Sequence, residues 1–133
     1  MKMKQCLVAT LLTAVLLSSP AAFATGPEED MAKLMFSEAY DVTDTIELSR
    51  IAWSILNRVD AGEASSIAES VRQYNFKEGA PLVGKFLRIS NNVLRNWEHE
   101  KTGKGGVKRT LPKRYIAFCR DGHRTEFYTS TWR

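Results

Sequence analysis

The sequence of 133 residues is poor in cysteine and in histidine, with two of each. So few cysteines exclude the disulfide-rich scaffold of many small secreted domains. Cys6 lies in an apolar N-terminal run that we expect to be cleaved off, so Cys119 is expected to have no disulfide partner. His99 and His123 form no HxxxH or HExxH motif, and we therefore expect neither a metal site nor a cofactor.

Long apolar runs are also missing, apart from one short run near the N-terminus. Residues 6–17 are too few to span a bilayer, which takes about 18 or more apolar residues. The run follows two lysines and precedes small residues that end in the A-x-A pattern of Ala22–Ala24, as in a secretory signal. We expect residues 1–24 to be a cleaved signal peptide, with an uncleaved anchor as the alternative. Residues 25–133 then form one periplasmic or secreted domain, expected to be a monomer without stable membrane insertion.

A large excess of one charge is absent as well. The formal net charge is +4, and removal of the two lysines in the signal lowers it to about +2. Such a small charge, together with the signal, argues against nucleic-acid binding. Seven basic residues and no acidic residue do lie between Lys101 and Arg120. This stretch either contacts an anionic polymer or is a solvated loop, and the second interpretation is the more common one.

Four amphipathic helices are predicted from apolar residues spaced three and four positions apart. They cover residues 31–40, 45–61, 66–75 and 82–101. The second has the most continuous apolar stripe, and it is framed by Asp44 as N-cap and by Gly62 just past its end. Ser66 with Glu69 predicts a capping box at the start of the third.

The C-terminal residues change from helical to strand periodicity. Residues 115–119 and 124–131 are rich in aromatic and β-branched side chains, and Asp121-Gly122 between them is a favoured two-residue hairpin turn. A hairpin alone is marginal in water, so we expect it to pack on the helices. The predicted fold class is α+β, mainly α: about four helices and a C-terminal β-hairpin.

Glu38 is the strongest candidate for chemistry, because helical spacing places it on an apolar face. That face carries Met31, Leu34 and Met35. Burial disfavours a charged carboxylate and raises its pKa, so that the group can hold a proton near neutral pH and donate it to a glycosidic oxygen. A structural ion pair with Arg50 or Arg58 is the alternative, and the residues alone favour it.

Several segments resemble a known family. Ser37-Glu38-Ala39 precedes a helix that ends in ILNRV, residues 55–59, and Ser66-Ile67 with Val71 and the Gln73 to Phe76 motif follow. The tail RTLPKRYIAFCRDGHRTEFY matches more loosely. Together these segments resemble the cell wall hydrolase family that includes the spore-cortex lytic enzymes, over nearly all of the expected mature chain.

The resemblance implies a lysozyme-like fold and an enzyme that cleaves the MurNAc–GlcNAc bond of peptidoglycan glycan strands, commonly as a lytic transglycosylase. Glu38 aligns with the catalytic glutamate of the family. A transglycosylase needs no second protein nucleophile, because one carboxyl can protonate the leaving oxygen and then act as the base. The 6-hydroxyl of the sugar thereby closes a 1,6-anhydro ring.

The residues after Ala39 depart from the family pattern. Relatives often carry a second acidic residue shortly after the glutamate, where this chain has Tyr40–Val42. A second carboxylate about 6.5–9.5 Å from Glu38 would permit inverting hydrolysis, and Asp41 and Asp44 are the nearest candidates. Loop solvation and helix capping are simpler roles for these two. A catalytically degenerate peptidoglycan-binding or accessory protein of the same fold is the alternative function, and an inhibitor or interaction module is a third.

Four further residues are candidates for substrate binding: Gln73, Tyr74, Phe76 and Tyr115. Amides and aromatic faces suit sugar rings, and all four lie in the segments that carry the resemblance. Tyr74 also continues the apolar stripe of the third helix, so core packing is an equal alternative for it. Asn57 is polar on an otherwise apolar helix, and we expect it to make buried hydrogen bonds that hold the site.

Overall fold

A computed structural model of the chain describes residues 26–103 and 108–130. Four helices precede two strands: α1 Pro27–Ala39, α2 Thr45–Asp60, α3 Ile67–Arg72, α4 Gly84–Lys101, β1 Ala117–Asp121 and β2 Arg124–Tyr128. The protein is α+β and mainly α, which confirms the predicted fold class. The expected signal peptide, residues 1–24, lies outside the described residues. Within them, no helix is long and apolar enough to cross a membrane.

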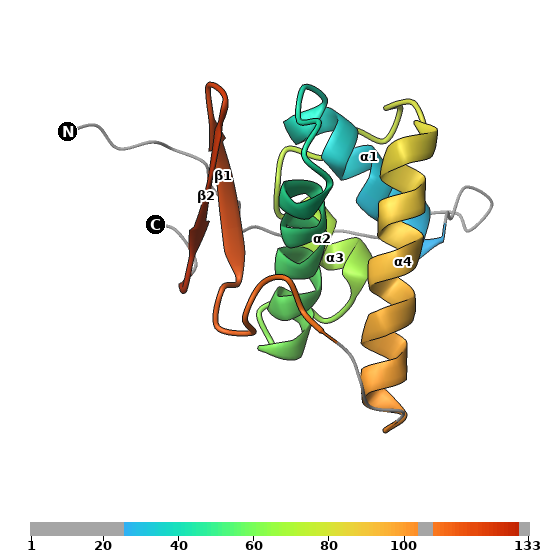
Figure 1. Ribbon diagram of the computed structural model, residues 1–133, viewed down its shortest axis with the longest axis vertical. Coiled ribbons are helices and arrows are strands. Elements are labelled where there is room, and N and C mark those ends of the chain that lie inside the picture. The colour runs from blue at the N-terminus through green and yellow to red at the C-terminus, as the bar shows by residue number, and fades with distance from the viewer. Residues whose placement is uncertain (1–25, 104–107, 131–133) are drawn as a thin grey trace.

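Helix α2 is the central element of the fold. It lies between the β-hairpin and α4, and it contacts the other three helices and β1 (Figure 1). Residues 51–58 are all buried, including Asn57 and Arg58, because neighbours surround this part of the helix. The predicted N-cap is confirmed: the Asp44 carboxylate accepts a hydrogen bond from the Ile46 N–H at 3.0 Å.

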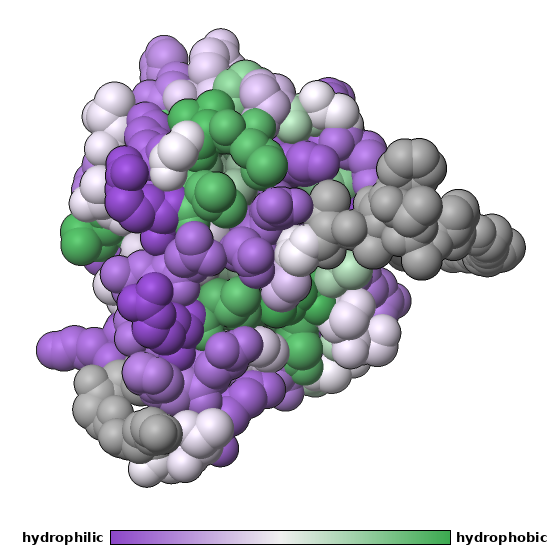
Figure 2. Space-filling model, turned by 90° about the vertical axis from the view of Figure 1, so that its right-hand side faces the viewer, coloured by the Kyte–Doolittle hydropathy of each residue, from purple (hydrophilic) through white to green (hydrophobic). Residues whose placement is uncertain are grey.

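Helix α4 forms one outer side of the molecule. Its apolar stripe of Phe86, Val93, Leu94 and Trp97 is buried against the other helices. The face of the molecule that α4 occupies is mainly hydrophilic, with separate hydrophobic areas between the polar side chains (Figure 2). The helix is therefore amphipathic, as its apolar spacing predicts.

The ends of α1 and α3 differ from the prediction. Helix α1 begins at Pro27, four residues before the predicted start, because proline at the first helical position and the acidic first turn favour a helix N-terminus there. Helix α3 has the predicted Ser66 cap, whose hydroxyl accepts from the Glu69 N–H at 3.1 Å. It ends at Arg72 rather than Asn75, and residues 73–76 form a turn.

The hairpin packs on the helices, as expected, but its turn is shifted by one residue. Asp121 pairs with Arg124 in the antiparallel ladder, so the two-residue loop is Gly122-His123 and not Asp121-Gly122. Gly122 has a φ of 64°, which glycine adopts without the cost of a side chain. Phe118 of β1 stacks on Tyr74 with ring centroids 4.6 Å apart, which fixes the hairpin to the turn after α3.

Cys119 lies in β1 and is buried, with 3% of its surface exposed. The expectation that Cys119 has no disulfide partner is made for the chain without residues 1–24, and it stays a prediction. That expectation assumed that Cys6 leaves with the signal peptide, and Cys6 lies outside the described residues.

Candidate active site

Glu38 lies in the last turn of α1, where the helix meets the turn after α3. Met31, Leu34 and Met35 on the same face are fully buried, whereas Glu38 is half-buried because it is at the helix end. Its Oε2 accepts a hydrogen bond from the Asn75 N–H at 3.3 Å. Helical spacing therefore predicts correctly that this carboxyl points toward the protein interior.

Burial raises the pKa of the Glu38 carboxyl above its ordinary value of 4.5. The Asn75 N–H and the positive charges of Lys77 and Arg120 act in the opposite direction, but the loss of hydration is the larger effect. Glu38 therefore keeps its proton to a higher pH than an exposed glutamate does.

The predicted structural ion pair of Glu38 with Arg50 or Arg58 does not form. Arg50 donates through Nε to the Thr110 carbonyl at 3.2 Å, and Arg58 donates to Gln73 and to the Ile116 carbonyl. Among residues 26–103 and 108–130, no cationic nitrogen lies within 4.0 Å of the Glu38 carboxylate. The carboxyl is thus free to exchange a proton with a ligand.

Arg120 of β1 borders Glu38 and is the residue that sequence reasoning missed. Its side chain is only 7% exposed, and it donates through Nε to the Glu38 carbonyl oxygen at 3.4 Å and through Nη2 to Asp41 at 2.7 Å. It also lies 3.5 Å from Glu47 of α2. Strand alternation places Arg120 on the same face as buried Phe118, a signal that would have separated it from the solvated basic residues.

Asp41 and Asp44, the candidates for a second catalytic carboxylate, both have structural partners. Asp41 pairs with Arg120 and lies 3.2 Å from Nδ1 of His123, and these contacts hold its pKa below the ordinary value, His123 contributing most. Asp44 caps α2. Capping by Asp44 is thus confirmed, and Asp41 is an exposed turn residue, as the simpler role suggests, that also forms an ion pair.

The turn after α3 contacts Glu38 through Asn75, and three of the four candidate substrate-binding residues lie in this turn within two positions of Asn75. Gln73 uses both ends of its amide: Oε1 accepts from Arg58 Nε at 2.8 Å, and Nε2 donates to the Glu63 carbonyl at 3.1 Å. These two hydrogen bonds hold the turn in place. The Gln73 amide therefore has a structural role in the protein without a ligand.

Tyr74 and Phe76, on either side of Asn75, differ in environment. Tyr74 stacks on Phe118, its Oη accepts from the Phe118 N–H at 3.3 Å, and burial raises its pKa to about 12. Core packing is thus one role of Tyr74. Phe76 is half-buried, and the Arg72 guanidinium lies 4.6 Å from the centre of its ring.

Tyr115 lies apart from the other candidates. It precedes β1, whereas Arg120, which contacts Glu38, is near the end of that strand. Its carbonyl accepts from Asn57 Nδ2 at 2.9 Å, and its ring lies under the Arg114 guanidinium at 4.7 Å. The structure therefore does not bring Tyr115 into contact with Glu38.

Asn57 makes the buried hydrogen bonds that we predict for it. It is fully buried, and its Nδ2 donates to the carbonyls of Pro112 and Tyr115, each at 2.9 Å. Its Oδ1 accepts from Arg109, whose side chain also pairs with Asp60 at 3.0 Å. Arg109 is only 9% exposed, so the solvated-loop interpretation of the basic stretch is wrong for this residue.

The described part of the chain contains no group of three or more His, Cys, Asp or Glu side chains that could hold a metal ion. In comparisons with known proteins, no family model, no curated protein and no solved structure matches the sequence.

Proposed function

We propose that the protein is an enzyme that cleaves the MurNAc–GlcNAc bond of peptidoglycan, as a lytic transglycosylase with Glu38 as its acid and base. The observation that carries the proposal is the environment of Glu38, a half-buried carboxyl with a raised pKa and no ion pair among the described residues. The similarity of SEA and ILNRV to segments of the cell wall hydrolase family supports the same assignment.

In the first step, protonated Glu38 donates its proton to the glycosidic oxygen as the bond between that oxygen and the MurNAc C1 breaks. Glu38 is then a carboxylate, which the Asn75 N–H and the charges of Lys77 and Arg120 stabilise. In the second step, this carboxylate takes the proton of the MurNAc 6-hydroxyl, whose oxygen bonds to C1. Glu38 ends protonated, ready for the next bond.

The surroundings of Glu38 favour ring closure over hydrolysis by a second carboxylate. Inverting hydrolysis needs another carboxylate as the base for a water molecule. Asp41 is bound to Arg120 and its pKa is lowered, so it is a weak base. The Asp44 carboxylate caps the N-terminus of α2 by accepting a hydrogen bond from the Ile46 N–H. A mechanism that uses one carboxyl twice requires neither.

The identity of the released products tests the proposal. We expect the purified protein, incubated with peptidoglycan sacculi, to release muropeptides that end in 1,6-anhydro-MurNAc, detected by mass spectrometry. Reducing ends in their place would show that the enzyme is a hydrolase. Binding to sacculi without products would favour the degenerate binding protein. Suppression of an added lysozyme, with neither binding nor products, would favour an inhibitor.

The pH dependence of cleavage is expected to report the raised pKa of Glu38. The first step needs the protonated carboxyl, so kcat/KM falls as the pH rises through this pKa. Because burial raises the pKa, the fall should lie above the ordinary value of 4.5. The measurement is the initial rate of sacculus solubilisation at constant ionic strength across the acidic and neutral range. A fall centred at or below the ordinary value would contradict the assignment.

A further inference from the structure

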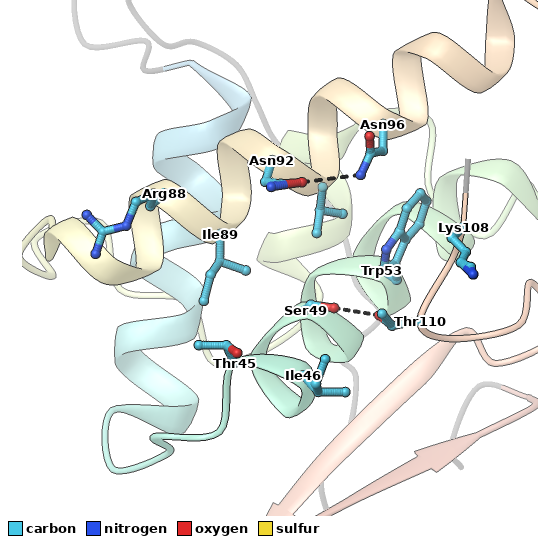
Figure 3. A pocket seen from close by; sticks show the side chains of 11 residues that line it. Thr45, Ile46, Ser49, Trp53, Arg88, Ile89, Asn92, Asn96, Lys108 and Thr110 are labelled. Carbon is cyan, nitrogen blue, oxygen red and sulfur yellow. Dashed lines mark hydrogen bonds between the residues drawn. The ribbon is translucent and has the colours of Figure 1, made fainter. Parts of the chain in front are cut away.

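A pocket of about 280 Å³ lies between α2 and α4, and Glu38 is not among the residues that line it (Figure 3). The pocket is therefore separate from the candidate active site. Its volume is close to the lower end of the range of small-molecule sites, about 300–1,000 Å³. A pocket of this size holds a ligand of one ring rather than an extended chain.

The two helices give the pocket walls of different chemistry. Helix α2 presents Ile46 and Trp53, which provide an apolar and aromatic wall. Helix α4 presents Arg88, Asn92 and Asn96, spaced four residues apart and therefore aligned on one face. Figure 3 shows these α4 side chains above those of α2, with Lys108 at one end. One wall thus suits an apolar surface, and the other suits hydrogen-bonding groups.

The two asparagines leave a donor and an acceptor for a ligand. Asn96 donates through Nδ2 to Asn92 Oδ1 at 3.2 Å. That bond uses Nδ2 of Asn96 and Oδ1 of Asn92. In the described part of the chain, the other two amide atoms, Nδ2 of Asn92 and Oδ1 of Asn96, have no hydrogen-bond partner. A donor beside an acceptor matches the C=O and N–H groups of an acetamido substituent.

The charge of the pocket favours an anion. Arg88 and Lys108 line it from opposite ends, and none of the lining residues is acidic. Both cations are exposed, and neither forms an ion pair with any carboxylate in residues 26–103 and 108–130. Their charges are thus available to a ligand carboxylate.

We propose that this pocket is a second carbohydrate site, which binds one N-acetylated amino sugar that carries a carboxylate. The acetamido group pairs with Asn92 and Asn96, the carboxylate lies beside Arg88, one helical turn from Asn92, and the apolar side of the sugar lies against α2. The proposal rests on the proposed function, because N-acetylmuramic acid units without a peptide stem are the sugars of this kind in peptidoglycan. In units that carry a stem, an amide bond to the peptide replaces the carboxylate. The pocket holds a glycan strand at a point away from Glu38.

Binding of N-acetylmuramic acid to the purified protein, followed by NMR, tests the proposal. We expect shifts of the Asn92 and Asn96 side-chain amide signals, and a Kd at least tenfold lower than for N-acetylglucosamine, which lacks the carboxylate. Asn92→Ala and Arg88→Ala should each weaken binding about tenfold or more. Asn91→Ala is the matched control, since Asn91 is an exposed neighbour on α4 outside the pocket, and it should change nothing.

Two results would overturn the pocket proposal: equal binding of the two sugars, or unchanged binding of N-acetylmuramic acid by Asn92→Ala and Arg88→Ala. Cleavage of sacculi is measured separately with the same proteins. Cleavage without binding in the pocket would reject the second site and leave the proposed function intact. Binding in the pocket without cleavage would support the site and reject the enzyme.

Discussion

Replacing Glu38 with glutamine is expected to lower the rate of muropeptide release from sacculi by about 10²–10⁴-fold. Glutamine keeps the shape of the side chain and can still accept the hydrogen bond from the Asn75 N–H. It can neither protonate the glycosidic oxygen nor take the proton of the sugar hydroxyl. The measurement is the initial rate of release, quantified by chromatography of soluble muropeptides.

The fold of the Glu38→Gln variant provides the control for this loss. Burial raises the pKa of Glu38, so the folded protein favours the protonated carboxyl. The stability that this protonated group contributes is complete below the ordinary pKa of 4.5 and is lost as the pH rises through the raised pKa, because the buried group then becomes charged. Glutamine has no charge to bury, so the variant should be at least as stable as the wild type at neutral pH. Circular dichroism during urea unfolding measures this.

A second variant separates the role of Glu38 from a general effect of lost charge. Glu98→Gln makes the same chemical change at an exposed position of α4, and it should leave the rate of release unchanged. If Glu38→Gln keeps more than about a tenth of the wild-type rate while folded, Glu38 is not the general acid, since that role supplies at least about 10².

The sequence predicts the interiors of the helices better than their ends. An apolar stripe indicates which residues of a helix face the core. The central residues of α1, α2 and α4 are therefore predicted to be helical from the spacing of apolar residues alone. The start of α1 lies outside that stripe and depends on Pro27 and the acidic first turn. The end of α3 depends on Gln73, whose amide binds Arg58 and Glu63 and holds the chain in a turn.

The candidate site is predictable where it depends on one helix and not where it depends on several elements. Spacing on α1 is enough to point Glu38 inward. The neighbour that shapes its surroundings, Arg120, is 82 positions away in the sequence, and the packing of β1 against α2 brings them together. The pocket between α2 and α4 escaped prediction for the same reason, because its walls come from two helices and from Lys108.

Replacing Arg109 with methionine is expected to lower the free energy of unfolding by about 3 kcal/mol, the lower end of the cost of breaking a buried ion pair. Arg109 pairs with Asp60 at 3.0 Å and with Glu100, and its guanidinium lies 4.5 Å from the centre of the Trp53 ring. Methionine fills similar space but leaves both carboxylates and Asn57 without this partner. The lower end applies because Asp60 and Glu100 are 22% and 34% exposed and regain some hydration.

Urea unfolding at several pH values measures the effect and its cause. Arg109 lowers the pKa of Glu100 through their hydrogen bond, so the stability from this pair is complete above the ordinary value of 4.5 and is lost as the pH falls through the lowered pKa. The difference between Arg109→Met and the wild type should therefore be largest at neutral pH and shrink in acid. A difference that does not change with pH would assign the loss to packing against Trp53.

Arg95→Met is the matched control for Arg109→Met, because Arg95 is an exposed arginine on α4 and its loss should cost less than about 0.5 kcal/mol. If both variants are equally stable, Arg109 does not hold the segment before β1 against α2 and α4. That segment carries Lys108 and Thr110 of the pocket and continues into the strand of Arg120. The Arg109 contacts thus connect the pocket wall with the strand that borders Glu38, and their loss should weaken N-acetylmuramic acid binding before the chain unfolds.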